Sequence, residues 1–99
     1  MKFMVTWSIN EENWLSVVEV FSSMTPEQRA DVGDDVKMLG RWHETTSKTG
    51  CAIMETTDLS ALNRYLNRWN PFMEVDVVPV LDDEETAALF KDVLADHSG

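Results

Sequence analysis

Residues 36–56, VKMLGRWHETTSKTGCAIMET, contain two segments rich in strand-forming residues, with a polar connection between them. The first segment, Val36–His43, carries apolar and aromatic residues together with Lys37, Arg41 and His43, and the second, Gly50–Thr56, is mostly apolar. Glu44–Thr49 holds only polar and charged residues. This pattern predicts an antiparallel β-hairpin in the middle of the chain.

A strand and a helix are expected before this hairpin. Lys2–Ser8 is rich in aromatic and β-branched residues, which favours a strand, and Asn10 is a candidate N-cap for the helix that follows. The apolar residues of this helix recur at helical spacing: Trp14, Val17, Val18 and Phe21. Thr25-Pro26 predicts that the helix ends near Met24, and Thr25 to Gln28 has the pattern of a capping box for a further short helix.

A helix, a strand and a last helix are expected after the hairpin. Asp58 is a candidate cap for an amphipathic helix with the stripe Leu59, Leu62, Leu66 and Trp69, which Asn70-Pro71 ends. Phe72–Leu81 reads as a fourth strand, and Pro79 places it at a sheet edge or a bulge. Asp82–Glu85 supplies the negative charge that a helix start favours, so we expect a C-terminal helix that frays from Asp96.

The resulting order is strand, helix, strand, strand, helix, strand, helix. It predicts an α+β, ferredoxin-like split βαβ fold (βαββαβ) with a four-stranded antiparallel sheet and an extra C-terminal helix. The 99 residues, 43% of them hydrophobic, are enough for one domain over residues 1–99. Both faces of the first and last strands carry apolar residues, so we expect one sheet face to form a homodimer interface in which the sheets pack together.

The chain is strongly acidic, with 18 Asp and Glu against 8 Lys and Arg and a formal net charge of −10. Such a charge repels nucleic acid and anionic membranes, so neither is expected as a partner. The single Cys51 cannot form an internal disulfide, and no apolar run is long enough for a membrane helix. We therefore expect a cytoplasmic protein.

The densest group of functional side chains is Arg41-Trp42-His43. Alternation along the hairpin predicts that Leu39, Arg41 and His43 share a face with Ala52 and Met54, whereas Trp42 lies with Cys51 and Ile53. We expect a pocket in which His43 is the catalytic proton carrier and Arg41 binds a carboxylate or an enolate-like oxygen. The further ligand-binding candidates are Trp42, Trp7, Thr6 and Asp76, with Met4, Met54 and Val78 as lining.

A purely structural interpretation competes with each of these assignments. Arg41 and His43 also fit a half-solvated strand end, paired with Asp76 or Glu44. Tryptophans in small domains are mostly core residues, and a buried, inert thiol is the simplest interpretation of Cys51. No metal-ligand spacing is present, so we expect no metal and no cofactor, although haem ligation by His43 stays open.

Three blocks of the sequence resemble a family of small bacterial proteins of unknown function. They are Met1-Lys2-Phe3-Met4-Val5-Thr6-Trp7-Ser8, Leu39-Gly40-Arg41-Trp42-His43 and Val78-Pro79-Val80-Leu81-Asp82-Asp83-Glu84-Glu85. That family is similar to the dimeric α+β barrel superfamily, which includes cofactor-free and haem-degrading monooxygenases. The resemblance implies a dimeric α+β barrel, and it implies no particular activity.

Two functional hypotheses follow. In the first, the protein binds a small molecule between sheet and helices and is a cofactor-free enzyme of monooxygenase or isomerase type. In the second, it is a non-catalytic homodimeric interaction module. The sequence leaves open whether the protein is an enzyme, and it does not name a substrate.

Overall fold

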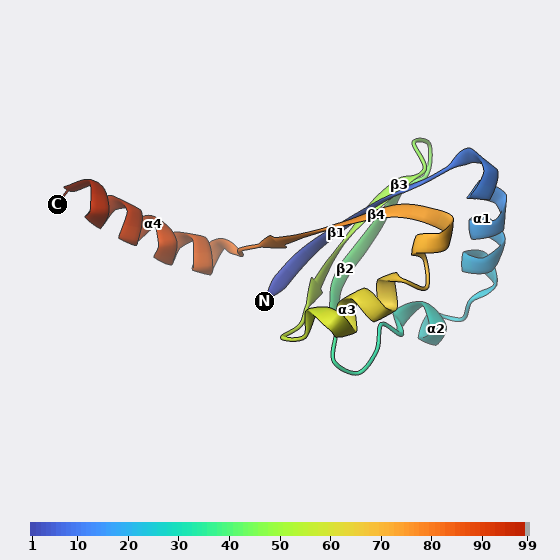
Figure 1. Ribbon diagram of the computed structural model, residues 1–99, viewed down its shortest axis with the longest axis horizontal. Coiled ribbons are helices and arrows are strands. Elements are labelled where there is room, and N and C mark those ends of the chain that lie inside the picture. Colours follow the sequence, from blue (N-terminus) through green and yellow to red (C-terminus); the bar gives the residue numbers. More distant parts are fainter. Residues whose placement is uncertain (99) are drawn as a thin grey trace.

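The computed structural model describes residues 1–98. Figure 1 shows its elements in chain order: β1 (Lys2–Ile9), η1 (Glu11–Asn13), α1 (Trp14–Ser23), α2 (Pro26–Ala30), β2 (Lys37–Glu44), β3 (Thr49–Glu55), α3 (Leu59–Leu66), η2 (Asn70–Phe72), β4 (Met73–Val80) and α4 (Asp83–Ser98). The predicted order of elements is confirmed, with two short 3₁₀ turns added.

The four strands form one antiparallel sheet in the order β2-β3-β1-β4. This is the ferredoxin-like α+β arrangement that the sequence predicts. Each central strand, β1 or β3, is followed by a helical connection that leads to an edge strand, β2 or β4. Pro79 lies in β4, which is an edge strand as predicted, since proline cannot donate a backbone hydrogen bond to a second neighbour.

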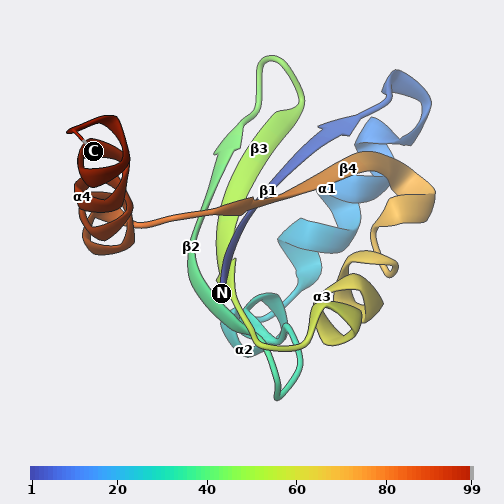
Figure 2. The ribbon, with the colours of Figure 1, turned by 60° about the vertical axis from the view of Figure 1, so that its left-hand side comes forward.

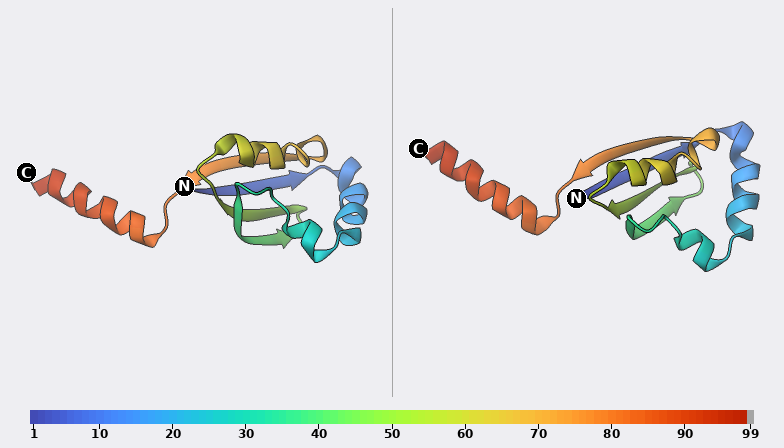
Figure 3. Two further views of the ribbon diagram at one scale, coloured as in Figure 1. Left: turned by 90° about the horizontal axis from the view of Figure 1, so that it is seen from below. Right: turned by 60° about the horizontal axis from the view of Figure 1, so that its bottom comes forward.

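The helices α1 and α3 lie over one face of the sheet (Figures 2 and 3). We call this the inner face, and its residues are Phe3, Val5, Trp7, Arg41, His43, Ala52, Met54, Val75 and Val77. The opposite face, which no helix of the described residues covers, is the outer face, and its residues are Met4, Thr6, Trp42, Cys51, Ile53, Asp76, Val78 and Val80. Strand alternation separates the two sets.

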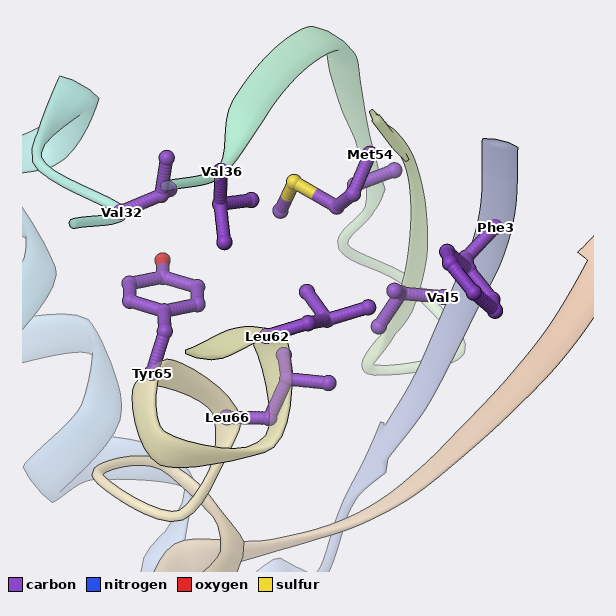
Figure 4. Close-up of a cluster of buried hydrophobic side chains, with 9 residues drawn as sticks. Phe3, Val5, Val32, Val36, Met54, Leu62, Tyr65 and Leu66 are labelled. Atoms are coloured by element: carbon purple, nitrogen blue, oxygen red, sulfur yellow. The ribbon is translucent and has the colours of Figure 1, made fainter. Parts of the chain in front are cut away.

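The hydrophobic core lies between the inner face and α3 (Figure 4). Leu62 from α3 is fully buried against Val5, Ala52 and Met54 of the sheet. The predicted helical stripe needs one correction, because Leu59 is 49% exposed whereas Tyr65 is buried. Leu59 is the first residue of α3 and lines a shallow groove with Met1 and Pro79 rather than the core.

Two of the three predicted helix caps are confirmed. Thr25 and Gln28 form a reciprocal capping box at the start of α2, and the Asp58 carboxylate accepts a hydrogen bond from the Ala61 amide at 3.2 Å. Asn10 stands at the start of η1 but its side chain caps no backbone amide. It accepts instead from the Asn13 amide group at 2.9 Å, because the first turn is 3₁₀ and brings these two side chains together.

A β-bulge in β2 corrects the predicted strand alternation at one position. Met38 pairs with Met54 and Gly40 pairs with Ile53, so Leu39 is the extra residue and is exposed. Met38 therefore packs against the core in place of Leu39. Beyond the bulge, Arg41 pairs with Ala52 and keeps the predicted inner position.

The C-terminal helix α4 extends away from the rest of the molecule (Figures 1 and 3). Helix α4 continues to Ser98, beyond Asp96 where fraying was expected. All of its side chains except Thr86 are exposed, so it contributes nothing to the core among the described residues.

Candidate functional site

A cavity of about 380 Å³ lies between the inner face of the sheet and the helices α1 and α3. The apolar stripe of α1 faces it through Trp14, Val17, Val18 and Phe21, as the helical spacing predicted. The sheet and the end of α3 add Trp7, Tyr65 and Trp69 to the lining. The cavity has the size of a small-molecule site and walls that are mostly aromatic and aliphatic.

The most prominent charge at this cavity is Arg41. Its side chain leaves the inner face of β2, and Nη2 donates to the backbone carbonyl of Arg29 at 3.0 Å. Nη1 donates to the Tyr65 hydroxyl at 3.4 Å. Among the described residues no carboxylate forms an ion pair with Arg41, although the chain carries 18 acidic residues.

The guanidinium of Arg29 in α2 lies near the same aromatic ring as that of Arg41, the ring of Phe21 in α1. The Cζ atoms of Arg41 and Arg29 lie 5.3 Å and 5.7 Å from the centroid of the Phe21 ring, which is within cation–π range. Arg29 is held by a 2.7 Å hydrogen bond to the carbonyl of Met24, and within residues 1–98 it too forms no ion pair. Arg29 near the end of α2 and Arg41 in β2 therefore place two positive charges without an ion pair next to one aromatic wall of the cavity.

His43 lies at the mouth of the cavity, two residues along β2 from Arg41. Its imidazole contacts the rings of Phe21 and Trp7 edge-on, at centroid distances of 5.0 Å and 5.6 Å. Partial burial, assisted by the positive charge of Arg41, lowers the pKa of His43 below its ordinary value of 6.5. The imidazole is therefore uncharged at neutral pH and able to accept a proton.

The hairpin turn and the start of α1 are joined beside the cavity. Lys48 adopts a left-handed backbone conformation with φ of 60°, and its carbonyl accepts from the Ile9 amide at 2.9 Å. Its ammonium pairs with Glu11 at 2.8 Å and lies 5.6 Å from the Trp14 ring centroid. These contacts hold η1 and Trp14, the first residue of α1, against the hairpin turn at the end of the sheet.

The structure brings Arg41, His43 and Trp7 together but separates them from the other predicted ligand-binding residues. Thr6 pairs with Cys51 on one side and with Asp76 on the other, so both Thr6 and Asp76 belong to the outer face. Met4 and Val78, predicted as lining, also belong to that face, whereas Met54 lines the cavity. The error has a simple cause, since neighbouring residues of a strand point to opposite sides of the sheet.

Trp42 is likewise absent from the cavity. Its indole covers Gly40 on the outer face, where a Cβ atom at Gly40 would collide with the ring, and 61% of its surface is exposed. Cys51 pairs with Trp42 across the β2–β3 ladder and lies on that same face, opposite to His43 as predicted.

Sequence reasoning missed Tyr65 and Arg29. Tyr65 is 7% exposed, its oxygen accepts from Arg41, and no acceptor for its own hydroxyl proton exists among the described residues. Its position three residues after Leu62 in α3 was a usable signal, because residues at that spacing share a helix face. Arg29 gave no such signal, since only the tertiary fold brings α2 beside β2.

No group of three or more metal-ligating side chains converges within residues 1–98. No helix in this part of the chain has the length and apolar character needed to span a membrane. Arg64 and Arg68 of the α3 region form no ion pair within residues 1–98.

Comparison with known proteins adds one structure and one family. A search of curated proteins gave no match. Among solved structures, the chain is similar to a protein from Deinococcus radiodurans named as a putative antibiotic biosynthesis monooxygenase. The two share 7% sequence identity and a TM-score of 0.43, and the match covers 82% of this chain and 92% of that one.

The family comparison covers nearly the whole chain. A model of a domain of unknown function, DUF3303, matches residues 1–94, which include every strand and most of α4. The three sequence blocks on which a family of uncharacterised proteins was expected all begin and end within that range. The chain therefore belongs to the DUF3303 family of domains of unknown function.

Proposed function

We propose that the cavity between the sheet and α1 binds a flat, largely apolar small molecule that carries an anionic oxygen. Arg41 binds that oxygen, and His43 exchanges a proton with the bound molecule. The main support for this proposal is the environment of Arg41. Its guanidinium is partly buried at the wall of an aromatic cavity, and it has no carboxylate partner among residues 1–98.

The charge distribution favours an anion at this position. The chain has a formal net charge of −10, yet two guanidiniums gather at Phe21 without an ion pair among the described residues. Charge-assisted hydrogen bonds to arginine are strong and directional, and they gain strength where water is excluded. The buried Tyr65 hydroxyl, which lacks an acceptor in this part of the chain, supplies a further donor close to the guanidinium.

The shape of the lining favours a flat body for the ligand. Three of the four tryptophans, Trp7, Trp14 and Trp69, line the cavity together with Phe21. Aromatic walls of this kind bury planar molecules with favourable edge and face contacts. A planar hydrocarbon body with a carboxylate or enolate oxygen satisfies both the walls and Arg41.

The chemistry available to such a site is proton transfer without a cofactor. An uncharged His43 accepts a proton from a carbon next to a carbonyl group, and Arg41 stabilises the enolate oxygen that results. Return of the proton to another atom completes an isomerisation. The same enolate is the kind of electron-rich species that a cofactor-free monooxygenase presents to oxygen.

Binding is tested by NMR with two isosteric probes, 1-naphthoate and the uncharged 1-naphthamide. The indole N–H signals of Trp7, Trp14 and Trp69 report on the cavity, and that of Trp42 reports on the outer face. We expect 1-naphthoate to shift the three cavity signals and to bind at least tenfold more tightly than 1-naphthamide. Arg41→Gln is expected to remove most of that difference.

Two results would contradict the binding proposal. One is a shift of Trp42 alone, which would place the probe on the outer face. The other is equal affinity for the anion and the amide in the unaltered protein, which would deny Arg41 its role. His43→Ala is expected to stay folded with weakened probe binding, so unchanged affinity for 1-naphthoate would remove His43 from the site.

A homodimeric module is the second candidate, and a different observation favours it. The outer face exposes Met4, Trp42 and Val78, with Ile53 and Cys51 partly covered between them. Contiguous apolar surface of this kind marks an interaction site, and a large exposed tryptophan is the residue type most often found at its centre. We propose that this face meets a second copy of the chain.

Sedimentation equilibrium tests this second candidate directly. We expect a dimer at micromolar concentration and a shift toward monomer in Trp42→Ser. A protein that stays monomeric at millimolar concentration would contradict the proposal.

A further inference from the structure

Helix α4 is the one long helix of the described chain without a buried side chain. Leu89, Phe90, Val93 and Leu94 are 45%, 59%, 40% and 69% exposed. Their spacing of one, four and five residues places all four on one side of the helix, with Glu84, Lys91 and Asp92 on the other. Most of the stability of a helix in a protein comes from packing its apolar face, so we expect this stripe to lie against a further surface.

The departure of α4 from its own sheet is built into the structure. Asp82 and Glu85 form a reciprocal capping box, with bonds of 2.8 Å and 3.1 Å. Lys2 at the start of β1 pairs with Asp82 at 3.1 Å, with Glu55 at 3.3 Å and with Glu85 at 3.7 Å. These contacts direct α4 away from the sheet, on the side that α1 and α3 leave uncovered (Figure 2).

The outer face is the matching surface, but α4 cannot reach it in the same copy. Only Leu81 and Asp82 separate β4 from α4, so folding back over its own sheet would need a chain reversal within these two residues and would break the pairs of Lys2 with Asp82 and Glu85. The dimensions agree, because 16 helical residues span about 24 Å and an eight-residue strand spans about 26 Å.

We propose that α4 of each copy packs its apolar stripe against the outer face of a second copy. One molecule carries both an uncovered helix and an uncovered sheet face, so a reciprocal exchange between two copies covers both at once and closes the assembly. A second copy supplies a sheet face for the helix and a helix for the sheet face. The inference rests on the homodimer proposed above and adds the element that makes the contact.

Both surfaces carry negative charge, which gives the contact a distinctive salt dependence. Helix α4 has five carboxylates and one lysine, and the outer face with its edges carries four carboxylates and two lysines, namely Glu44, Glu55, Glu74, Asp76, Lys2 and Lys37. Like charges oppose association and are screened by salt, whereas burial of apolar surface is not weakened. Dimerisation through α4 therefore tightens as sodium chloride is raised from 0.05 M to 0.5 M.

The experiment compares two double variants of the full chain by sedimentation equilibrium and amide hydrogen exchange. Phe90→Ser with Leu94→Ser removes the centre of the apolar stripe. Ala88→Ser with Ala95→Ser makes the same kind of change on the opposite side of α4 and is the control. We expect the first pair to raise the dimer dissociation constant at least tenfold and to abolish α4 amide protection, and the control to stay within threefold.

The outcomes separate this inference from the homodimer on which it rests. If Phe90→Ser with Leu94→Ser dimerises as tightly as the unaltered chain while Trp42→Ser does not, the face is an interface and α4 is no part of it. If the unaltered chain is a monomer with unprotected α4 amides, both proposals fail. Oligomers that grow beyond the dimer with concentration, or weaker association at high salt, would overturn the reciprocal exchange.

Discussion

The indole of Trp7 occupies the space directly above Gly50, its partner across the β1–β3 ladder. A Cβ atom at Gly50 would collide with the Trp7 ring and would also lie 2.8 Å from the backbone carbonyl of Trp42. The Trp7 ring, which fits here because Gly50 has no Cβ atom, is part of the cavity lining and contacts His43 edge-on. The smallest side chain of β3 thus determines where one wall of the candidate site lies.

Gly50→Ala is expected to destabilise the protein by about 1–3 kcal/mol, because the backbone beside it cannot yield and the Trp7 ring must move. Urea unfolding followed by circular dichroism measures the change. Gly40→Ala is the matched control, since the atoms nearest to a Cβ there all belong to the end of the Trp42 side chain and none to the backbone. Equal losses in the two variants would contradict the packing argument.

Leu62→Ala is expected to cost about 2–5 kcal/mol of unfolding free energy. Leu62 is fully buried between α3 and the sheet, so truncation leaves a void among Val5, Ala52 and Met54. The companion variant Leu59→Ala, three residues earlier and 49% exposed, is expected to change stability by less than about 0.5 kcal/mol. Chemical unfolding of both variants checks the placement of the α3 face, and a reversed order of effects would refute it.

His43 is expected to titrate below its ordinary pKa of 6.5, because partial burial and the nearby Arg41 disfavour its protonated form. His97→Gln leaves His43 as the single histidine, so its imidazole signal is followed by NMR without overlap. Adding Arg41→Gln is expected to raise the midpoint by removing one of the two causes. A midpoint at or above 6.5 in the protein with Arg41 intact would contradict the lowered pKa, and an unchanged midpoint in Arg41→Gln would show that the guanidinium does not act on the imidazole.

The same shift makes stability depend on pH in a defined direction. The unfolded chain binds a proton at His43 more readily than the folded chain does, so protonation favours unfolding. The contribution of His43 to stability is fully present above pH 6.5 and is lost as the pH falls from there through the lower folded pKa. Unfolding curves recorded across that window should show a smaller dependence on pH in His43→Gln than in the unaltered chain.

Thr25→Ala is expected to lower stability by about 1 kcal/mol. The threonine hydroxyl accepts from the Gln28 amide at 3.1 Å, and Gln28 returns a hydrogen bond of 2.8 Å to the Thr25 amide. Because α2 carries the Arg29 carbonyl that holds Arg41, the variant should also weaken 1-naphthoate binding. Thr57→Ala, at an exposed position without a capping role, is the control for both measurements.

Much of the chain's local structure was readable from the sequence alone. The order of strands and helices, the capping box at Thr25, the Asp58 cap and the edge position of Pro79 all follow from residue types a few positions apart. The alternation of β2 also placed Arg41 and His43 with Ala52, and Trp42 with Cys51. These features depend on local spacing and on strand geometry, which a sequence displays directly.

What only the tertiary structure decided is which distant elements meet. The prediction grouped Thr6 and Asp76 with Arg41 by matching the faces of β1 and β4 to that of β2. This match passes through the pairings of neighbouring strands in the order β2-β3-β1-β4, and a shift of one residue in any pairing exchanges the faces. Arg29 and Tyr65 join Arg41 only because α2 and α3 pack beside the same strand. The sequence predicted helix α4, but the direction in which α4 leaves the sheet depends on the ion pair of Asp82 with Lys2, 80 positions earlier in the chain. The sequence by itself determined the elements and their order, and the packing of elements remote along the chain determined the cavity and the exposed helix.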